Sequence, residues 1–282
     1  MKYVVIGDKG MFGSELVALL QDRGLPVAGF NRSNLDIENS STVDLGVVLG
    51  DFDVVVNAVA YTAVDKAELE IFEANTVNAI YAGKLAQAAA LAGAKFMHIS
   101  TDYVFDGQAT HPYGVADRVD PKSEYGRSKA FGEKLVSESG ADYTIFRTAW
   151  LYGKFGRCFP KIIASVLDKN GSARVVEDQL GQPTWTRGLA EQVLAFANLE
   201  NAPKIVHAVS SGQGSWADFA REVSKSLGLE SASIAGISTI DYPTPAKRPA
   251  WSVLDNSSDL VAPIGDWRER WLVAAGEVLG SR

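Results

Sequence analysis

The stretch YVVIGDKGMFG, residues 3–13, carries an apolar run into Gly7, Gly10 and Gly13, and a helical pattern follows it as far as Asp22. Glycines in such a turn let backbone N–H groups approach a pyrophosphate, which the N-terminus of the helix stabilises electrostatically. The spacing is GxxGxxG rather than the GxGxxG of the usual dinucleotide fingerprint, so a strand-to-helix turn without a ligand stays an alternative. The position after the first strand of the chain favours a phosphate-binding loop.

Short β-branched runs alternate with longer helical patterns along the rest of the chain. Strands are predicted at Tyr3–Ile6, Val27–Phe30, Asp53–Ala58, Lys95–Ser100, Tyr143–Arg147, Arg174–Val176 and Ile205–Val209. Helices are predicted at Gly13–Asp22, Glu73–Ala92, Ser123–Glu138, Leu189–Leu199 and Trp216–Leu227. Several strands are nearly continuous apolar runs, which is typical of parallel strands covered on both faces. The alternation predicts an α/β fold with a doubly wound parallel sheet of the Rossmann type.

The regular alternation of predicted strands and helices becomes weaker after Trp150, where glycine, proline and aromatic residues become frequent. We therefore predict a dinucleotide-binding domain over residues 1–150 and a smaller C-terminal substrate-binding lobe formed mainly by residues 151–282. The segment 187–209 keeps the pattern of a helix and a strand, and we expect it to return to the first sheet.

Composition excludes several classes of protein. The 282 residues carry 27 basic and 34 acidic side chains, a net charge of −7, which argues against a nucleic-acid partner because phosphate contacts require a basic face. Cys158 is the single cysteine, so an internal disulfide is excluded and a reducing compartment is indicated. The apolar run at the N-terminus is too short for a signal peptide or a membrane span. We expect a cytoplasmic protein with no membrane partner.

The residues after the second predicted strand bear on the choice of cofactor. An acidic residue there would hold the ribose 2′-hydroxyl of NAD and repel a 2′-phosphate. The strand instead ends in Asn31 and Arg32, and a guanidinium can bind a 2′-phosphate with two hydrogen bonds. This favours NADP(H), with NAD(H) tolerated, although Arg32 as a solvated loop charge stays an alternative. Asp36 is a candidate for the adenine amino group.

A second constellation lies on the predicted helix Ser123–Glu138. Tyr125 and Lys129 are four residues apart, which places the phenol and the ammonium on one helix face. A cation beside a phenol lowers the phenol pKa toward the range where it works as an acid-base catalyst. Thr101 follows the fourth predicted strand, where a ligand lies in an open α/β sheet, and can hydrogen-bond the carbonyl that Tyr125 protonates. Tyr-x-x-x-Lys alone arises often by chance, but the glycine loop, the strand-end hydroxyl and this helix occur in the expected order.

At this point the chain resembles the extended short-chain dehydrogenase/reductases, and within them the dTDP-4-dehydrorhamnose reductase family. The stretches that carry the resemblance are GDKGMFG, VVNAVAYTAVDKAE, STDYVFDG, EYGRSKAFGE, RTAWLYG, DQLGQPTW and KRPAWSVLDNS. The resemblance implies NADPH-dependent reduction of the 4-keto group of dTDP-4-dehydro-β-L-rhamnose to dTDP-β-L-rhamnose. That reaction belongs to nucleotide-sugar synthesis for surface polysaccharides.

The resemblance also implies roles for individual residues. Tyr125 would donate a proton to the developing alkoxide, Lys129 would hold the nicotinamide ribose and tune Tyr125, and Thr101 would orient the carbonyl. The cofactor would be bound by Gly7, Gly10, Met11, Phe12, Asn31, Arg32, Asp36, Ala58, Ala60, Tyr61, Tyr125 and Lys129. The sugar pocket would contain Thr101, Asp102, Tyr103, Tyr125 and Trp150.

Two positions depart from the family pattern. Members that dimerise through magnesium use several glutamates; Glu15 matches one of them, but Arg187 stands where another is expected. A cation there would repel Mg²⁺, so we predict no metal and a monomer, or a dimer not bridged by magnesium. Glu15 then becomes a first-turn acid favoured by the helix dipole. Cys158 stands where the family has asparagine, and a thiol cannot replace the two donors of an amide.

The net charge and the implied anionic ligand lead to further predictions about single residues and about function. An acidic protein that binds a nucleotide diphosphate needs local cations, and Lys247 and Arg248 are candidates, with Arg248 assigned to the substrate. His98 and His207 lie in predicted strands and are expected to be core residues rather than metal ligands. One alternative function is a non-catalytic NADP-binding subunit resembling the regulatory subunit of methionine adenosyltransferase, against which the intact Thr101, Tyr125 and Lys129 speak. Another is a reductase of a different nucleotide keto-sugar.

Overall fold

The computed structural model describes residues 1–229 and 233–280. Its centre is a six-stranded sheet in the order β10-β5-β4-β3-β1-β2, and every neighbouring pair is parallel. The strands are β1 (Tyr3–Ile6), β2 (Val27–Phe30), β3 (Val54–Asn57), β4 (Lys95–Thr101), β5 (Asp142–Thr148) and β10 (Ile205–His207). The predicted α/β fold with a doubly wound parallel sheet is confirmed.

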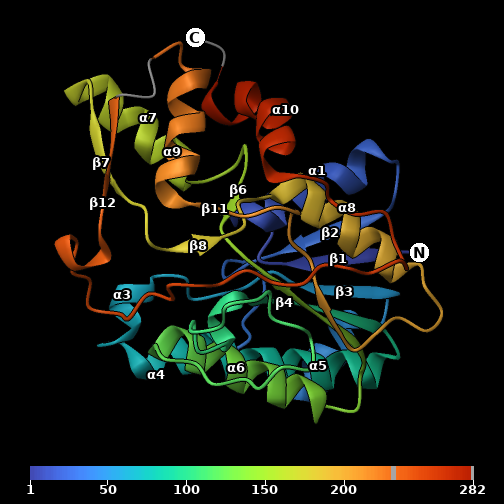
Figure 1. The fold of residues 1–282 in the computed structure, drawn as a ribbon. Helices are drawn as coiled ribbons and strands as arrows, with labels where there is room; N and C mark the ends of the chain where they lie inside the picture. Colours follow the sequence, from blue (N-terminus) through green and yellow to red (C-terminus); the bar gives the residue numbers. More distant parts are fainter. Residues whose placement is uncertain (230–232, 281–282) are drawn as a thin grey trace.

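Helices cover both faces of this sheet, as Figure 1 shows. The helices are α1 (Met11–Asp22), α2 (Thr42–Leu49), α3 (Val64–Ala67), α4 (Ile71–Asn75), α5 (Tyr81–Ala92), α6 (Glu124–Ser137), α7 (Phe159–Asn170), α8 (Thr186–Ala197), α9 (Trp216–Ser226) and α10 (Trp267–Leu279). Alternate residues of β1 face opposite layers: Tyr3 and Val5 pack toward α1 and α8, whereas Val4 and Ile6 pack toward α2 and α5. The sheet is thus buried on both sides, which accounts for its apolar strands.

The strand order reverses between β1 and β3. The chain passes from β1 outward to β2, then returns to place β3 on the other side of β1 and continues to β4, β5 and β10. In open α/β sheets ligands bind beyond the carboxyl ends of the strands at such a reversal. The loops after β1, β3 and β4 therefore surround the expected ligand site.

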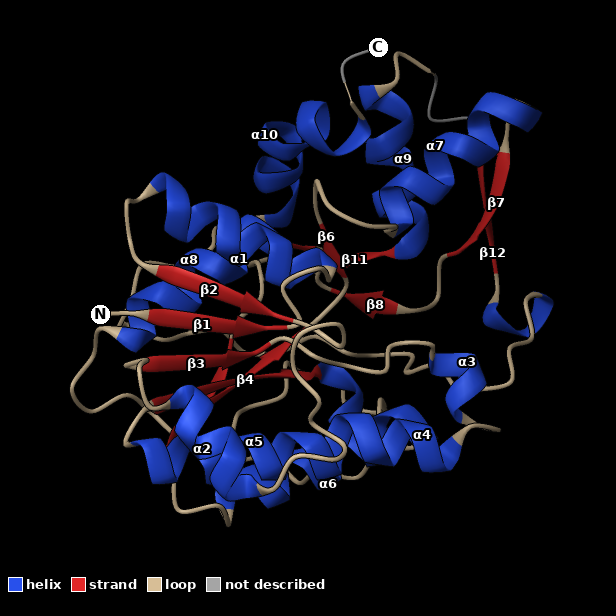
Figure 2. Ribbon diagram, turned by 180° about the vertical axis from the view of Figure 1, so that it is seen from behind, coloured by secondary structure: helices blue, strands red, loops and turns tan. Residues whose placement is uncertain are grey.

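A second apolar cluster lies beyond the carboxyl ends of the strands, as seen from behind in Figure 2. It contains α7, α9 and α10 together with β7 (Ala173–Val176) and β12 (Ile234–Ile237), which pair in parallel. Three short strands, β6 (Leu151–Tyr152), β8 (Leu180–Gly181) and β9 (Thr184–Trp185), connect this region to the sheet, and β8 pairs with β11 (Gly214–Ser215). After α8 the chain joins the central sheet through β10, beside β5. The division into two domains stays a prediction.

Two sequence expectations about helices need correction. The predicted helix Glu73–Ala92 is α4 followed by a π-helical turn, η1 (Thr76–Ile80), and α5. Glu15 is not a first-turn acid, because α1 begins at Met11 and its first turn holds none. Among the described residues no helix is long and apolar enough to cross a membrane.

Candidate cofactor and substrate site

The glycine loop joins β1 to α1 at the reversal of the sheet. Gly7 has a φ of +94°, and a Cβ there would lie 2.9 Å from the carbonyl carbon of Ala58. A Cβ on Gly13 would overlap the carbonyl oxygen of Gly7, so loop and helix can pack this closely only with glycine at both positions. Gly10 is the N-cap of α1, and within the described structure no side chain caps that turn. The first N–H groups of α1 are therefore available to an anion, which suits a pyrophosphate.

Two residues predicted to surround the pyrophosphate use their side chains elsewhere. Phe12 is buried in the core between α1, α8 and the sheet, and Met11 packs against the C-terminal cluster. Only their backbone N–H groups, in the first turn of α1, are placed to meet a phosphate.

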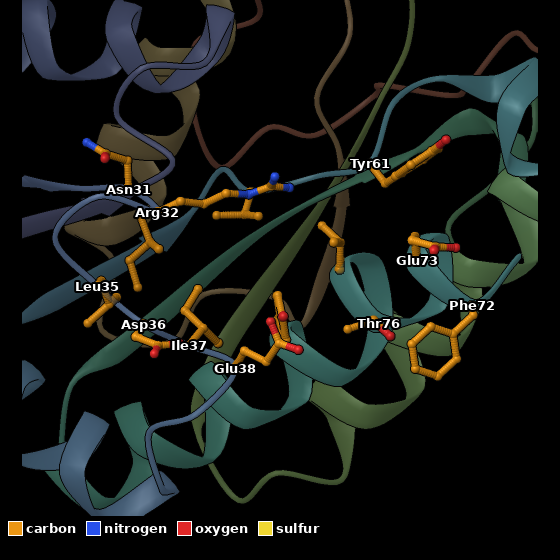
Figure 3. Close-up of a pocket in the computed structure, with 14 residues that line it drawn as sticks. Asn31, Arg32, Leu35, Asp36, Ile37, Glu38, Tyr61, Phe72, Glu73 and Thr76 are labelled. Carbon is orange, nitrogen blue, oxygen red and sulfur yellow. The ribbon is translucent and has the colours of Figure 1, made fainter. Parts of the chain in front are cut away.

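A cavity of about 560 Å³ opens beside the glycine loop. Figure 3 shows that it lies between the segment that follows β2 and the helical segments η1 and α5, with the Arg32 side chain extending across it. Its lining is formed by Ile6, Asn31, Arg32, Leu35, Asp36, Ile37, Glu38, Val59, Tyr61, Phe72, Glu73, Thr76, Val77 and Tyr81. The lining combines apolar side chains with three carboxylates, Asp36, Glu38 and Glu73, and one guanidinium, which suits an adenosine whose 2′-phosphate meets Arg32. The residues present therefore fit a dinucleotide cofactor.

Other residues assigned to the adenosine half are held by local hydrogen bonds. Asn31 donates through Nδ2 to Asp8 Oδ1 at 2.9 Å, which ties the loop after β2 to the glycine loop. Both oxygens of Asp36 accept hydrogen bonds from Asn39, at 3.0 and 2.9 Å, and these bonds hold the pKa of Asp36 below its usual value. The contact of Asp36 with an adenine amino group stays a prediction.

The loop after β3 lies on the other side of the point where the strand order reverses, opposite the glycine loop. Ala58 lies against Gly7, and Ala60 is exposed at the surface. Tyr61 lines the cavity, and its hydroxyl donates to Glu70, a bond that raises the pKa of Tyr61 to about 12. Tyr61 is therefore a neutral hydrogen-bonding group at physiological pH.

Thr101 and Asp102 are buried at the carboxyl end of β4. The Thr101 hydroxyl donates to Asp102 Oδ1 at 2.9 Å and accepts from the backbone N–H of Tyr103 at 3.2 Å. Burial raises the pKa of Asp102 to about 6, and among the described residues Oδ2 is one of the buried oxygens without a hydrogen-bond partner. An unpartnered carboxylate oxygen beside the strand end is available to a hydroxyl group of a ligand.

Tyr125 lies beside this strand end on α6. Its ring meets the Tyr103 ring edge-on, with centroids 5.5 Å apart. Burial raises the pKa of Tyr125 to about 12, while a hydrogen bond with Thr101 opposes the rise. The sequence predicted a lowered pKa, and this direction is wrong for the structure, because desolvation of the phenolate outweighs the hydrogen bond. Tyr125 is consequently a protonated phenol at neutral pH.

Lys129 lies one turn further along α6 and is almost fully buried. Its Nζ donates to the carbonyl oxygen of Ile99 in β4 at 2.6 Å. Burial lowers the pKa of Lys129 to about 8, and the carboxylate of Glu133 opposes this shift. Glu133 is itself paired with Arg147 of β5, at 2.7 Å, so the buried charges of α6 are balanced against the sheet.

Asn78, which the sequence analysis missed, connects the elements of the site. It is fully buried in the π-helical turn, and its amide nitrogen donates to Ser128 Oγ at 2.9 Å and to the Tyr61 carbonyl at 3.1 Å. Its amide oxygen accepts from the backbone N–H of Tyr61 at 2.8 Å. Asn78 thus fixes the loop after β3 against α6. The sequence offers only a weak signal for this role, an asparagine among the apolar residues Val77, Ala79 and Ile80.

Arg248 approaches the same region from the C-terminal part of the chain. Its Nη2 pairs with Asp65 Oδ2 at 2.6 Å, and Asp65 Oδ1 also accepts from the backbone N–H of Ala246 at 3.2 Å. Nη1 of Arg248 is buried and, within the described residues, has no hydrogen-bond partner. Lys247 is exposed. Arg248 thus lies beside Tyr103 with one free donor group, and its contact with a substrate stays a prediction.

The remaining predicted positions lie near the end of β5. Trp150 is half-buried directly before β6. Cys158 is buried in the C-terminal cluster, and its thiol donates to the carbonyl oxygen of Gly153 at 3.7 Å. His98 and His207 are both buried, and burial lowers the pKa of each, that of His207 to about 4. The two histidines are neutral core residues at physiological pH.

Arg187 occupies the middle of a group of carboxylates between α1 and α8. Its guanidinium lies 3.7 Å from Glu15 Oε1, 3.4 Å from Asp22 Oδ2 and 3.8 Å from Glu191 Oε1. Glu15 is buried, and burial together with the charge of Glu277 raises its pKa. In the described parts of the chain no group of three or more His, Cys, Asp or Glu side chains is arranged to hold a metal ion. The absence of a metal from the protein stays a prediction.

Comparison with known proteins gives matches over almost the entire chain. The family described as the RmlD substrate binding domain matches residues 1–279. The dTDP-4-dehydrorhamnose reductase of Streptomyces griseus is 40% identical over 276 residues, which cover 95% of this chain and 90% of that protein. A probable dTDP-4,6-dihydroxy-2-methyloxan-3-one 4-ketoreductase of Streptomyces antibioticus is 35% identical over 285 residues, 100% of this chain and 97% of that protein.

A solved structure extends the similarity to three dimensions. The dTDP-4-dehydrorhamnose reductase of Bacillus anthracis, in complex with NADP, superposes with a TM-score of 0.91 at 30% identity, covering 97% of this chain and 99% of that one. The relatives and this structure agree with the motifs from which the resemblance was inferred. The chain belongs to the RmlD substrate binding domain family.

Proposed function

We propose that this protein reduces the 4-keto group of dTDP-4-dehydro-β-L-rhamnose to dTDP-β-L-rhamnose with NADPH. The observation that carries the proposal is the position of Thr101, Asp102 and Tyr125 together at the carboxyl end of β4, at the same edge of the sheet as the glycine loop. The names of the Streptomyces griseus and Bacillus anthracis relatives support the substrate and the cofactor. The predicted cytoplasmic location is part of this proposal.

The chain's own residues perform the proton transfer in this proposal. When bound, NADPH supplies a hydride to the keto carbon. Tyr125, a neutral phenol whose pKa is about 12, donates its proton to the oxygen on which negative charge develops. Thr101 would hold that oxygen by turning its single hydroxyl proton to it from Asp102 Oδ1, the acceptor of that proton in the structure.

Lys129 and the glycine loop hold the cofactor. Lys129 is fixed on the buried face of α6, where its ammonium reaches toward β4 and can meet the nicotinamide ribose. The first turn of α1 binds the pyrophosphate, and Arg32 binds the 2′-phosphate across the cavity that it lines. Arg248 offers its free Nη1 to the anionic substrate.

A reductase of another nucleotide keto-sugar is the second candidate. It is favoured by the probable 4-ketoreductase of Streptomyces antibioticus, whose name gives a different dTDP-linked ketose and which matches the whole chain at 35% identity. Both candidates use the same proton donor, so mechanism does not separate them.

The test is the rate of NADPH oxidation with a panel of nucleotide keto-sugars prepared in situ. We expect the highest kcat/KM with dTDP-4-dehydrorhamnose, at least about tenfold above the other ketoses, because pocket contacts of 1–3 kcal/mol separate close analogues. A higher kcat/KM with another ketose would select the second candidate. NADPH binding with no oxidation by any ketose would favour the non-catalytic alternative.

A further inference from the structure

Trp150 has an unusual backbone conformation. Within residues 1–229 and 233–280 it is the one residue other than glycine with a positive φ, 45°. A bulky side chain rarely adopts this region, and such residues persist only where their surroundings enforce them, most often at ligand sites. Trp150 lies two residues beyond Thr148, which pairs with Thr101 in the sheet. The strained residue therefore emerges at the edge that holds the proposed site.

Three contacts enforce this conformation. The Trp150 ring stacks on the Trp216 ring, with centroids 3.6 Å apart and planes 8° from parallel. A Cβ on Gly181 would lie 2.5 Å from Cε2 of Trp150, so the ring occupies space that another residue at 181 would fill. The Trp150 carbonyl accepts from the backbone N–H of Thr184 at 3.2 Å.

These contacts come from segments that are distant in sequence but meet beside the central sheet. Trp216 opens α9 directly after β11, and β11 pairs with β8 so that Ser215 faces Leu180. Figures 1 and 2 both place β6, β8 and β11 beyond the carboxyl ends of the central strands. The start of α9 thus holds the Trp216 ring against the Trp150 ring and fixes the position of the Trp150 indole.

The stack leaves one polar group of Trp150 unused. The indole N–H of Trp150 has no hydrogen-bond acceptor in the described parts of the chain, and the residue is half-buried rather than enclosed. We propose that Trp216 is a positioning residue, which acts through Trp150 to form a wall of the sugar-nucleotide pocket. This inference rests on the proposed function, because its ligand is the substrate of that reaction. Trp216 itself need not touch the substrate.

The test compares Trp216→Phe and Trp216→Ala with the wild type and with Trp185→Phe as the matched control. Trp185 donates its indole N–H to Glu277 and is not a member of the Trp150–Trp216 stack, so its replacement leaves the stack intact. The exciton couplet of the stacked indoles in circular dichroism should disappear in both Trp216 variants and persist in Trp185→Phe. In Trp216→Ala the KM for the keto-sugar should rise about five- to tenfold, in line with the energy of an aromatic pair, with kcat changed less than about twofold. Trp216→Phe should show a smaller rise, and NADPH affinity should not change.

A second variant perturbs the Trp150–Trp216 stack from the side of Trp150. Gly181→Ala should push Trp150 away from Trp216, weaken the couplet and raise the KM similarly, while an unfolding transition confirms that the variant is folded. Loss of the couplet with an unchanged KM would overturn the inference and leave the proposed function intact. A wild-type protein that turns over no keto-sugar would instead contradict the proposed function itself.

Discussion

At the scale of single residues, the site depends on environments that sequence patterns do not reveal. The four-residue spacing of Tyr125 and Lys129 is visible in the sequence, but the pKa of Tyr125 is raised because the surrounding protein desolvates the phenolate. A raised pKa suits a reductase, since the proton donor must begin as a neutral phenol. Asn78 was not predicted, and Trp216 was expected only to begin a helix, because their importance lies in contacts with segments far away in the chain.

We expect Arg32 to determine the preference between the two nicotinamide cofactors. Arg32→Ala should weaken NADPH binding by about tenfold or more, because a hydrogen bond to a charged group contributes roughly 1.5–3 kcal/mol, and NADH binding should change less than about twofold. Titration calorimetry with both cofactors measures this. Arg23→Ala, which removes an exposed arginine paired with Glu191, is the control. Equal losses for the two cofactors would show that Arg32 does not bind the 2′-phosphate.

Asp102 makes stability depend on pH. Its folded-state pKa of about 6 lies above the ordinary value of 3.8, so the folded protein holds a proton that the unfolded chain releases between these values. Asp102 therefore lowers stability progressively as pH rises from about 4 to 6, by on the order of 1–3 kcal/mol in total. Asp102→Asn should be more stable than wild type at pH 7.5, and the gain should shrink at pH 4. Urea unfolding at the two pH values measures this; a gain independent of pH would refute it.

At the scale of elements, strands were predicted more closely than helices. The buried strand Tyr3–Ile6 and the half-buried edge strand Val27–Phe30 match their predicted bounds, because parallel strands are short apolar runs ended by glycine or polar residues. The π-helical turn Thr76–Ile80 has no such signature, since apolar periodicity does not distinguish it from the α-helices on either side. The pairing of β7 with β12 joins residues about sixty positions apart and could not be read from local patterns.

The glycine loop allows a test at this scale. Gly13→Ala should weaken NADPH binding at least about tenfold and lower the Tm, because the new methyl group would overlap the Gly7 carbonyl and shift the first turn of α1. Gly276→Ala is the control: its site on α10 is open, and alanine there should stabilise the helix by up to about 1 kcal/mol. Wild-type affinity for NADPH in Gly13→Ala would remove the loop from the cofactor site.

At the scale of the whole molecule, the net charge of −7 contrasts with a site for two anionic ligands. The free N–H groups at the start of α1 and a few placed cations, among them Arg32 and Arg248, offset this charge locally. Arg187 does the same among the carboxylates between α1 and α8. The sequence predicted these cations one by one, but their partners became evident only from the fold.

Arg187 also underlies a prediction about assembly. Because its guanidinium already neutralises Glu15, EDTA or added MgCl₂ should change neither the elution volume nor the reaction rate of the wild-type protein. Arg187→Glu should acquire a response to Mg²⁺, since it places a second carboxylate beside Glu15. Size-exclusion chromatography with light scattering measures both. A wild-type dimer that dissociates in EDTA would contradict the prediction of a monomer or of a dimer not bridged by magnesium.

In the proposed reaction, hydride reaches C4 of the sugar while Tyr125 supplies the proton. The most direct measurement incubates wild type and Tyr125→Phe with dTDP-4-dehydrorhamnose and NADPH that carries two deuterium atoms at C4 of the nicotinamide. We expect deuterium at C4 of the product sugar with the wild type, and turnover lowered about 10²–10⁴-fold in Tyr125→Phe with NADPH affinity unchanged. A product without deuterium at C4, or wild-type turnover by Tyr125→Phe, would contradict the account.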